Sequence, residues 1–235
     1  MTDWKLRTRM LLGDRAVEAL EKKRGIVFGL GGVGGQACEA LARAGIGSLD
    51  LVDKDIIDST NINRQIIALP ETVGRPKVEV MRERLEAINP QIGGDNYKVC
   101  FSQELEEKFS FASYDFIIDA IDDVEGKLLL AKMSQQDRVL FISSMGSANK
   151  LDPSQLEITS LYKTTVCPLA RAMRKGARDL GLEDYPVVYS KEKPTRSEDY
   201  QPGPLASSSF VPPAAGLMMV SYVVRSLVAM EGLIK

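Results

Sequence analysis

The residues best suited to chemistry lie between positions 25 and 77, where glycine, carboxylate and cationic side chains follow one another. A Gly-x-Gly-x-x-Gly pattern comes directly after an apolar stretch and opens an amphipathic one. Its glycines are Gly29, Gly31, Gly32 and Gly34. They let the backbone approach a phosphate, whose charge a helix N-terminus favours. Asp53 ends the next apolar stretch, where a carboxylate can accept hydrogen bonds from ribose hydroxyls. The pattern predicts a nucleotide site; a tight turn without a ligand is the alternative.

Polar side chains after Asp53 distinguish between kinds of nucleotide chemistry. The glycine loop and acid alone point first to a nicotinamide or flavin enzyme. Four polar residues follow within 24 positions of Asp53, namely Asp55, Asn61, Arg64 and Lys77. An arginine, a lysine and amide donors stabilise charge on phosphate oxygens and on departing pyrophosphate, and a dehydrogenase has no use for them there. They favour phosphoryl or nucleotidyl transfer; a solvated surface loop is the alternative.

A second acidic group, Asp119-Ala120-Ile121-Asp122-Asp123, ends a later apolar stretch. The carboxyl ends of parallel strands are where ligands bind in open α/β sheets. Magnesium takes one or two carboxylates together with phosphate oxygens and water, and Asp122 is the candidate ligand. The ordinary alternative for an aspartate here is to cap the following helix, a role that suits Asp123.

Composition excludes several classes of mechanism. The 235 residues contain no histidine, which rules out Ser-His-Asp and Cys-His catalysis and His-ligated metals. The three cysteines are widely spaced without a Cys-x-x-Cys pair, so neither a four-cysteine zinc site nor a disulfide framework is expected. The formal net charge of -2 gives no global attraction to nucleic acid or membrane. Without a stretch that resembles a signal peptide, the chain is expected to be cytoplasmic.

Apolar stretches with strand and helix periodicity alternate along the first 143 residues. We expect strands at 25–29, 48–52, 97–101, 114–118 and 139–143, and helices at 34–44, 75–88 and 124–136. This order predicts an α/β fold with a Rossmann-like, mostly parallel sheet, helices on both faces, and a C-terminal extension that continues the sheet. We expect one domain, 1–235, with a nucleotide-binding half at about 9–143 and a substrate-side half at about 144–235.

In the substrate-side half, strands and helices no longer alternate regularly. An extended stretch at 156–160 precedes a predicted helix at 168–181, and 192–209 is rich in Pro, Ser, Gly and charge, which favours a mobile segment. Residues 214–234 are apolar over about the length of a membrane span. Arg225 and Glu231 interrupt this stretch, and its apolar residues follow a helical stripe. A core or dimer-interface helix is therefore favoured, and no stable membrane association is expected.

Four cationic residues in the predicted helix 168–181 fall at i, i+3, i+4 and i+7. They are Arg171, Arg174, Lys175 and Arg178. This spacing places them on one helix face, which would attract a polyanion such as tRNA with strong salt dependence. A basic helix face is more often simply solvated.

The motifs together resemble the ubiquitin-activating-enzyme superfamily, in its bacterial ThiF, MoeB and HesA branch, over about residues 9–143. Members activate a carboxylate as an acyl-adenylate and release pyrophosphate. The resemblance implies ATP and Mg²⁺, with Asp53 on the ribose, Asp122 linked to magnesium, and Asn61, Arg64 and Lys77 on phosphates. Arg9 is similar to the arginine that a partner subunit inserts toward the triphosphate, which implies a homodimer.

Two branches of this family differ in the carboxylate that they activate. Sulfur-carrier activators adenylate the C-terminal glycine of a ubiquitin-like protein and usually carry two zinc-binding Cys-x-x-Cys pairs, which this chain lacks. The stretches 42–47, 63–66, 118–122 and 151–156 are similar to tRNA threonylcarbamoyladenosine dehydratases. We therefore favour ATP-dependent cyclisation of that nucleoside and no structural zinc. The alternatives are a carrier-protein adenylyltransferase and a non-catalytic nucleotide-binding dimer.

Cysteine is where the chain departs from this family. Relatives carry a cysteine in a stretch that resembles 187–192, where this sequence has none. Cys167 precedes Pro168 near basic residues, where a thiol pKa falls, and is the substitute candidate for a thioester or persulfide step. A sulfur-transfer protein would then be a partner. Cys38 and Cys100 are expected to be inert core residues.

Overall fold

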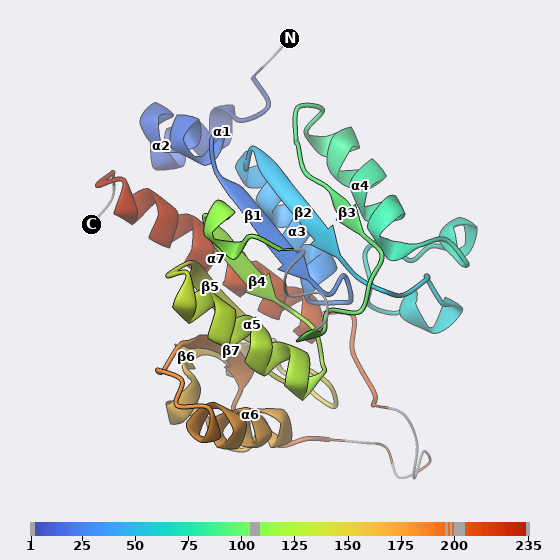
Figure 1. Cartoon of the computed structure of the whole chain (residues 1–235). Coiled ribbons are helices and arrows are strands. Elements are labelled where there is room, and N and C mark those ends of the chain that lie inside the picture. The colour runs from blue at the N-terminus through green and yellow to red at the C-terminus, as the bar shows by residue number, and fades with distance from the viewer. Residues whose placement is uncertain (1–2, 104–108, 196, 198, 200–204, 234–235) are drawn as a thin grey trace.

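A seven-stranded sheet organises the chain, in the order β3-β2-β1-β4-β5-β7-β6 (Figure 1). The structure is a computed structural model that describes residues 3–103, 109–195, 197, 199 and 205–233. Neighbouring strands are parallel, except that β6 pairs antiparallel with β7. The strands are β1 (Arg24–Phe28), β2 (Ser48–Val52), β3 (Asn96–Tyr97), β4 (Phe116–Asp119), β5 (Leu140–Ser144), β6 (Leu156–Ser160) and β7 (Pro186–Ser190). The predicted fold class is confirmed, and β7 and β6 form the extension that continues the sheet.

Helices cover both faces of this sheet. The α-helices are α1 (Leu6–Leu12), α2 (Asp14–Leu20), α3 (Gly34–Ala44), α4 (Lys77–Ile88), α5 (Val124–Gln136), α6 (Pro168–Asp179) and α7 (Val211–Met230). One core packs α3, α4 and α7 against the sheet, and the other packs α5 and α6. Short 3-10 turns include η1 (Ser59–Asn61), η2 (Pro70–Thr72), η4 (Phe111–Ser113), η5 (Pro153–Gln155) and η6 (Leu161–Lys163).

Strand residues alternate between the two cores. In β1, Val27 packs into the core of α3 and α7, whereas Ile26 and Phe28 pack into the core of α5 and α6. Because both faces are covered, the central strands are mostly apolar on both sides, as is usual for parallel strands.

The connections after β1 and β4 determine where a ligand can bind. β1 and β4 are adjacent and parallel, and their helices α3 and α5 lie on opposite faces of the sheet. The two chain segments therefore separate at the carboxyl ends of these strands and leave a crevice between them. Both the glycine loop and the 119–123 group begin at this crevice.

Several predicted boundaries are wrong. The strand predicted at 97–101 exists only as Asn96–Tyr97, because the chain then leaves the sheet edge and Phe101 packs on Phe28 with ring centroids 4.9 Å apart. Helix α4 begins at Lys77 rather than at 75, since Pro76 is extended, with φ -58° and ψ 133°, and proline disfavours a helical residue before it. Strand β7 and helices α1 and α2 were not predicted.

The apolar C-terminal helix is a core helix, as favoured from the sequence. By length and composition α7 could cross a membrane. It nevertheless packs on α3, where Gly216 permits contact so close that a Cβ would lie 2.3 Å from the Val33 carbonyl oxygen.

The predicted mobile segment 192–209 lies partly outside the described residues, at 196, 198 and 200–204. Its described flanks are both hydrogen-bonded to Asn149. The Thr195 and Ala206 amides donate to the Asn149 carbonyl and side-chain oxygens at 2.8 and 2.9 Å.

Candidate active site

A cavity of about 470 Å³ occupies the crevice at the carboxyl ends of β1, β2 and β4. The structure brings together at this cavity most of the residues predicted from the sequence. Its lining includes Gly29, Gly31, Gly32, Asp53, Asp55, Asn61, Arg64, Lys77 and Asp122. Gly34 lies just beneath, at the start of α3. The predicted nucleotide site is therefore one continuous space.

The glycines of the loop serve different purposes. Gly29 has φ +87°, and a Cβ there would lie 2.6 Å from the Ala120 carbonyl oxygen. A Cβ on Gly34 would lie 1.8 Å from the Gly29 carbonyl oxygen. Gly31 is different, because a Cβ would meet only Gln65 Nε2, at 3.9 Å. Gly29 and Gly34 thus permit close backbone packing, while Gly31 leaves space toward the cavity for a ligand.

Asp53 is buried at the end of β2 and is held by the backbone. Its Oδ2 accepts from the Leu30 amide of the glycine loop at 2.6 Å, and its Oδ1 accepts from the Asp55 amide at 2.8 Å. These bonds fix the carboxylate against the glycine loop. The carboxylate lies on the cavity wall, as a ribose-binding acid would need to.

Lys77 is buried at the start of α4 and faces two carboxylates. Its Nζ lies 3.0 Å from Asp55 Oδ2 and 4.0 Å from Asp53 Oδ2. The Lys77 amide donates to the Asp55 carbonyl oxygen at 3.1 Å. The acidic loop after β2 therefore positions this lysine at the cavity.

Arg64 and Asn61 are held by the turn that contains η1. The Asn61 carbonyl oxygen accepts from the Arg64 and Gln65 amides, at 3.0 and 2.9 Å. Arg64 Nη1 donates to Asn63 Oδ1 at 2.7 Å and to the Thr60 carbonyl oxygen at 3.0 Å. The guanidinium is thus oriented by neutral acceptors and keeps its charge available to an anion.

Gln65 is a cavity residue that the sequence motifs do not predict. Its side chain lines the cavity and is only 6% exposed. Its Oε1 is buried without a hydrogen-bond partner among the described residues. A buried acceptor of this kind is costly unless a ligand or water donates to it.

A fully buried ion pair, which no sequence motif predicts, supports the loop after β4. Lys127 and Asp119 are 0% exposed, with Nζ 3.0 Å from Asp119 Oδ2. The Ser143 hydroxyl donates to the same oxygen at 2.6 Å. Lys127 Nζ also donates to the Ile121 carbonyl oxygen at 3.0 Å, and the Ile121 amide donates to Asp119 Oδ1 at 3.3 Å. Both polar groups of the Ile121 backbone are therefore held by one ion pair.

A sequence signal for Lys127 exists. It falls at i, i+3, i+4 and i+7 with Leu130, Ala131 and Ser134, which form the buried face of α5. Helical side chains lean toward the N-terminus, so Lys127 reaches back to the loop that precedes α5. A lysine on an otherwise buried helix face indicates a buried anionic partner.

Asp122 and Asp123 are exposed at the cavity mouth. Asp123 caps α5, because its Oδ2 accepts from the Gly126 amide at 2.6 Å, as predicted. Asp122 belongs to the loop held by Lys127. Among the described residues no group of three or more Asp, Glu or Cys side chains is placed to hold a metal.

Apolar side chains complete the lining of the cavity. They are Phe28 of β1, Val52 of β2, Val99 and Phe101 after β3, and Ile121 after β4. Cys100 also lines the cavity and is exposed, so the prediction that it is an inert core residue is wrong. The reason is that β3 ends at Tyr97, before Cys100 could enter the sheet.

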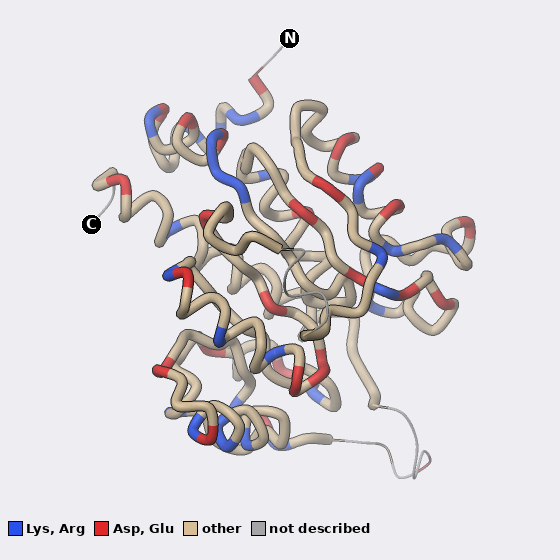
Figure 2. Tube along the Cα trace, in the orientation of Figure 1, with Lys and Arg blue, Asp and Glu red and all other residues tan. Residues whose placement is uncertain are grey.

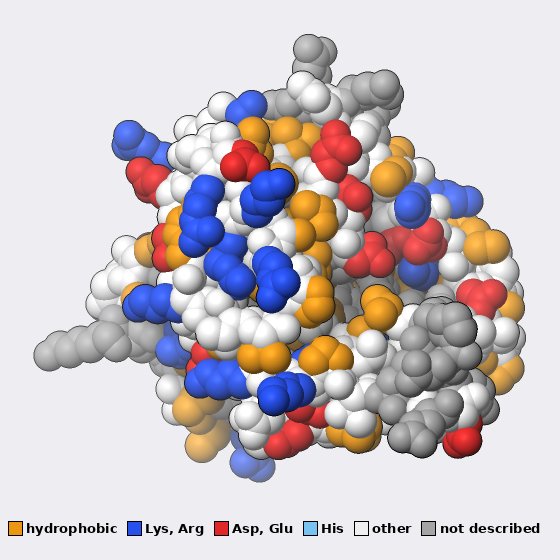
Figure 3. Space-filling view, turned by 90° about the horizontal axis from the view of Figure 1, so that it is seen from below, with side chains coloured by type: hydrophobic (Ala, Val, Ile, Leu, Met, Phe, Trp, Pro, Cys, Tyr) orange, Lys and Arg blue, Asp and Glu red, His pale blue; other side chains and the backbone are white. Residues whose placement is uncertain are grey.

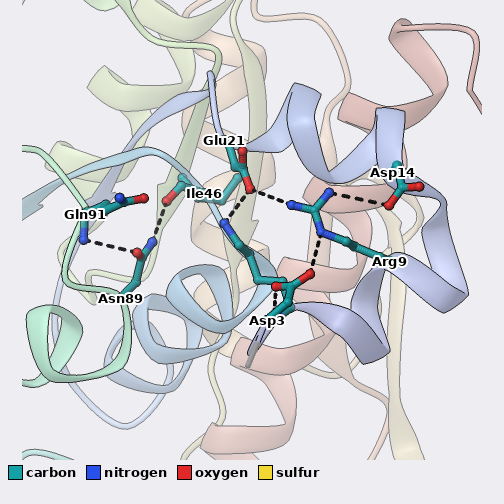
Figure 4. Close-up of polar contacts among 8 residues, drawn as sticks. Asp3, Arg9, Asp14, Glu21, Ile46, Asn89 and Gln91 are labelled. Carbon is teal, nitrogen blue, oxygen red and sulfur yellow. Dashed lines mark hydrogen bonds and ion pairs between the residues drawn. The ribbon is translucent and has the colours of Figure 1, made fainter. Parts of the chain in front are cut away.

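Arg9 does not reach the cavity of its own chain. On α1 its Nε lies 2.9 Å from Asp3 Oδ2, and its Nη atoms lie 3.6 Å from Asp14 and 3.4 Å from Glu21 (Figure 4). In Figure 1, α1 lies at the end of the sheet opposite to the loops that form the cavity.

The remaining cysteines are buried. Burial raises the pKa of the Cys38 thiol far above its usual range, which confirms an inert residue. Cys167 is the N-cap residue of α6, as predicted, but is only 3% exposed. It does not line the cavity.

The chain is similar to known proteins in sequence and in structure. A model of the ThiF family matches residues 5–231. The tRNA threonylcarbamoyladenosine dehydratase of Bacillus subtilis (strain 168) is 38% identical over 236 residues, which cover 94% of this chain and 93% of that protein. The crystal structure of the Escherichia coli tRNA N6-threonylcarbamoyladenosine dehydratase, TcdA, in complex with ATP superposes with a TM-score of 0.91 and 31% identity, covering 99% of this chain and 98% of that one. The molybdopterin-synthase adenylyltransferase of E. coli (strain K12) is 38% identical over 107 residues, 46% of this chain and 43% of that protein.

Breaking the buried ion pair is expected to destabilise the protein. In Lys127→Met, Asp119 loses its cationic partner inside the core, and the free energy of unfolding should fall by about 3–5 kcal/mol. Denaturant unfolding measures this change. Lys132→Met, at an exposed position of the same helix, is the control and should stay within about 0.5 kcal/mol of the wild type. An equally small effect of Lys127→Met would contradict the assigned role, whereas Asp119→Asn added to Lys127→Met should recover part of the loss.

The three thiols should react at different rates. Cys100 is exposed in the cavity wall, whereas Cys38 and Cys167 are buried. We expect an alkylating reagent to modify Cys100 first and ATP to slow that reaction, because a bound nucleotide would cover the wall. Peptide mass spectrometry at timed intervals measures each site, and Cys100→Ser is the control. Fast labelling of Cys167, or labelling of Cys100 that ATP leaves unchanged, would contradict this description of the cavity.

Proposed function

The chain belongs to the ThiF family, and from this premise we propose that it is an ATP-dependent dehydratase that cyclises threonylcarbamoyladenosine in tRNA. The observation that carries the proposal is the cavity at the β1–β4 crevice, which joins Asp53, Arg64, Lys77 and Asp122 in one space. The choice of substrate rests on how much of this chain aligns with each kind of relative. A dehydratase aligns along 94% of this chain, and the molybdopterin-synthase adenylyltransferase along 46%.

The residues of the cavity fit ATP as substrate. Gly31 leaves open space beside the helix N-terminus of α3, where backbone amides and the helix dipole favour phosphate. The Gln65 acceptor is buried without a partner among the described residues, and a ligand donor would satisfy it. We propose that Asp53 holds the ribose, that the partly exposed Val99 and Ile121 contact the base, and that Asn61, Arg64 and Lys77 contact the phosphates.

The charges of the cavity support a requirement for magnesium. Its lining contains the carboxylates Asp53, Asp55, Asp58, Asp122 and Asp123 against the cations Lys54, Arg64 and Lys77. An excess of carboxylates would repel a triphosphate, and a divalent cation between them removes that repulsion. We propose Asp122 as the protein ligand, because it is exposed at the mouth on a loop that Lys127 fixes. When bound, Mg²⁺ would neutralise charge on the phosphate oxygens.

The first chemical step would be adenylation of the substrate. A carboxylate oxygen of the threonyl group attacks the α-phosphorus of ATP, a new P–O bond forms, and the bond to pyrophosphate breaks. Arg64 and Lys77 would stabilise the charge that moves to the departing pyrophosphate. No side chain of the enzyme has to act as nucleophile, which is consistent with the absence of histidine.

The second step would be ring closure. The neighbouring carbamoyl group attacks the activated carbonyl carbon, gives up a proton, and AMP leaves with the carboxylate oxygen. The net change in the nucleoside is the loss of one water. Because both reacting groups belong to one nucleoside side chain, proximity supplies much of the acceleration, and the protein chiefly excludes water and holds the phosphates.

We further propose that the enzyme is a homodimer in which Arg9 serves the partner's cavity. Within its own chain Arg9 lies on α1, remote from the cavity loops. The same helix exposes Leu6, Met10 and Leu11, and apolar residues of this kind favour a protein contact. Arg9 would exchange its present carboxylate partners for a triphosphate.

The division of the chain and its partners are also proposals. Residues 9–143 would bind the nucleotide, and 144–235 would face the substrate. The enzyme would act in the cytoplasm, where its three free cysteines stay reduced. A sulfur-transfer protein is a proposed partner of the substrate-side half, but Cys167 would have to become accessible before it could exchange sulfur.

Incubation with modified tRNA, ATP and Mg²⁺ tests the proposed function. Mass spectrometry of the digested nucleosides should show threonylcarbamoyladenosine losing one water. Arg64→Ala should slow this reaction on the order of 10²- to 10³-fold, as loss of one charge-stabilising donor does, without a change in melting temperature. Arg75→Ala is the control, because Arg75 is an arginine paired with Glu83 on the surface.

Three outcomes would contradict parts of this proposal. No mass loss with correctly modified tRNA would sink the dehydratase function. ATP–pyrophosphate exchange that needs a Gly-Gly-ended carrier protein would favour the adenylyltransferase instead. Unchanged turnover by Arg64→Ala would refute the phosphate assignment.

Mixing two inactive variants tests the shared site. If Arg9 acts in the partner's cavity, one of the two sites in a mixed dimer of Arg9→Ala and Arg64→Ala contains both arginines. Random exchange of subunits should then restore about a quarter of wild-type activity, since a two-fold dimer has two equivalent sites. Each variant alone is the control. No recovery, in a mixture shown by native mass spectrometry to contain mixed dimers, would place Arg9 outside the partner's site.

A further inference from the structure

We propose that the outer face of α6 is the surface on which the protein docks the phosphate backbone of tRNA. We call this surface, formed by Arg171, Lys175 and Arg178, the α6 basic face. The proposal rests on the proposed function, because tRNA is the substrate there. The inference adds to that function the place where tRNA would bind, on the side of the molecule that faces the viewer in Figure 3.

The packing of α6 forces its cationic residues outward. Ala170, Met173 and Ala177 are buried against the core shared with α5. Gly176 lets α6 approach α5 so closely that a Cβ would lie 2.3 Å from Leu128 Cδ1. The opposite side of the helix is therefore the solvent side, and Arg171, Lys175 and Arg178 are exposed there. Figure 2 shows the basic positions gathered along α6.

Intrachain contacts orient this face without neutralising it. The Arg178 guanidinium lies over the Tyr162 ring, 5.2 Å from its centroid. Arg174 is half-buried and donates to the Thr164 carbonyl oxygen at 2.9 Å, so it braces the helix rather than extending into solvent. Across the described part of the chain, no carboxylate forms an ion pair with any of the four basic residues of α6. The predicted stripe thus consists of three presented charges and one structural arginine.

The location of the face suits a substrate that must also reach the cavity. Gly176 contacts α5 at Leu128, five positions after the cavity residue Asp123, or roughly 7–8 Å along the helix axis. From Arg171 to Arg178 the charges extend over roughly 10 Å. A nucleic acid strand held there would have nearby nucleotides within reach of the cavity mouth.

Charge and packing favour RNA over a membrane as the partner. The protein as a whole has a formal charge of -2, so a local concentration of cations is what would attract a polyanion. An interfacial membrane helix needs an apolar face free to insert among lipids. The apolar face of α6 is occupied by the core.

Salt-dependent binding of labelled tRNA, measured by fluorescence anisotropy without ATP, tests the proposal. The test variant is Arg171→Gln/Lys175→Gln/Arg178→Gln in the full chain. If three phosphate contacts are lost, the slope of log Kd against log salt should fall by about 2 to 3. The factor by which Kd rises between 50 and 200 mM NaCl should then be smaller in the variant than in the wild type, by roughly 20-fold or more. At 50 mM NaCl the variant should also have a higher Kd for tRNA than the wild type.

A matched variant separates this surface from net charge. The variant Arg15→Gln/Lys22→Gln/Arg225→Gln removes the same number of positive charges elsewhere. Arg15 is exposed on α2, Lys22 is exposed just after α2, and Arg225 is exposed on α7. This variant should bind tRNA with the wild-type slope. Equal loss in both variants, or loss in neither, would overturn the proposal. Vesicles of phosphatidylcholine and phosphatidylserine are a further arm, and tight binding to them through the same three residues would assign the face to membranes instead.

Turnover distinguishes failure of this inference from failure of the proposed function. The α6 variant should raise the KM for tRNA and leave kcat near the wild-type value, because none of its residues lines the cavity. If the wild type binds tRNA through α6 but never dehydrates it, the docking surface stands and the dehydratase function falls. If the wild type dehydrates tRNA and the α6 variant has an unchanged KM and slope, the docking surface falls alone.

Discussion

The buried ion pair between Asp119 and Lys127 is the constraint on which the site depends. Two charges without solvent contact are costly unless their remaining hydrogen bonds are satisfied, and here Ser143 and both backbone groups of Ile121 satisfy them. The pair therefore restrains the path of the chain between β4 and α5 at Ile121. That path places the Ala120 carbonyl oxygen against Gly29, so that the glycine loop is fixed by the same contact. The loop that carries Asp122 and the glycine loop are thus both held in place by this buried ion pair.

The rest of the cavity is positioned by a second group of charges on β2 and α4. Asp53 is fixed by the Leu30 and Asp55 amides, and Lys77 faces Asp55 across the acidic loop. Arg64, by contrast, is oriented by neutral oxygens. The cavity therefore presents both carboxylates and cations, and a phosphate group bound there would lie beside Arg64 and Lys77. This arrangement can activate a carboxylate without a protein nucleophile.

Local sequence pattern accounts for much of this site because its residues follow one another along the first half-domain. The glycine loop, Asp53, the Asp123 cap and the alternating strands are each determined by neighbours within a few residues. The failures involve contacts that the periodicity of a single helix or strand does not encode. Lys127 pairs with Asp119 across the start of α5, Cys100 becomes exposed because β3 ends early, and β7 forms only beside β5 and β6. Of the basic stripe on α6, Arg174 is turned inward by Thr164, a contact that helical spacing cannot indicate.

In the proposed reaction, a carboxylate of the substrate cleaves ATP at the α-phosphate. The most direct measurement uses tRNA whose threonylcarbamoyladenosine carries ¹⁸O in the carboxylate, with mass spectrometry of the released nucleotide after one turnover. An acyl-adenylate route transfers one labelled oxygen to the phosphate of AMP, because ring closure breaks the bond between the carbonyl carbon and that oxygen. We expect labelled AMP and unlabelled pyrophosphate. Label in inorganic phosphate, with ADP as the product, would show instead that the carboxylate attacks the γ-phosphate.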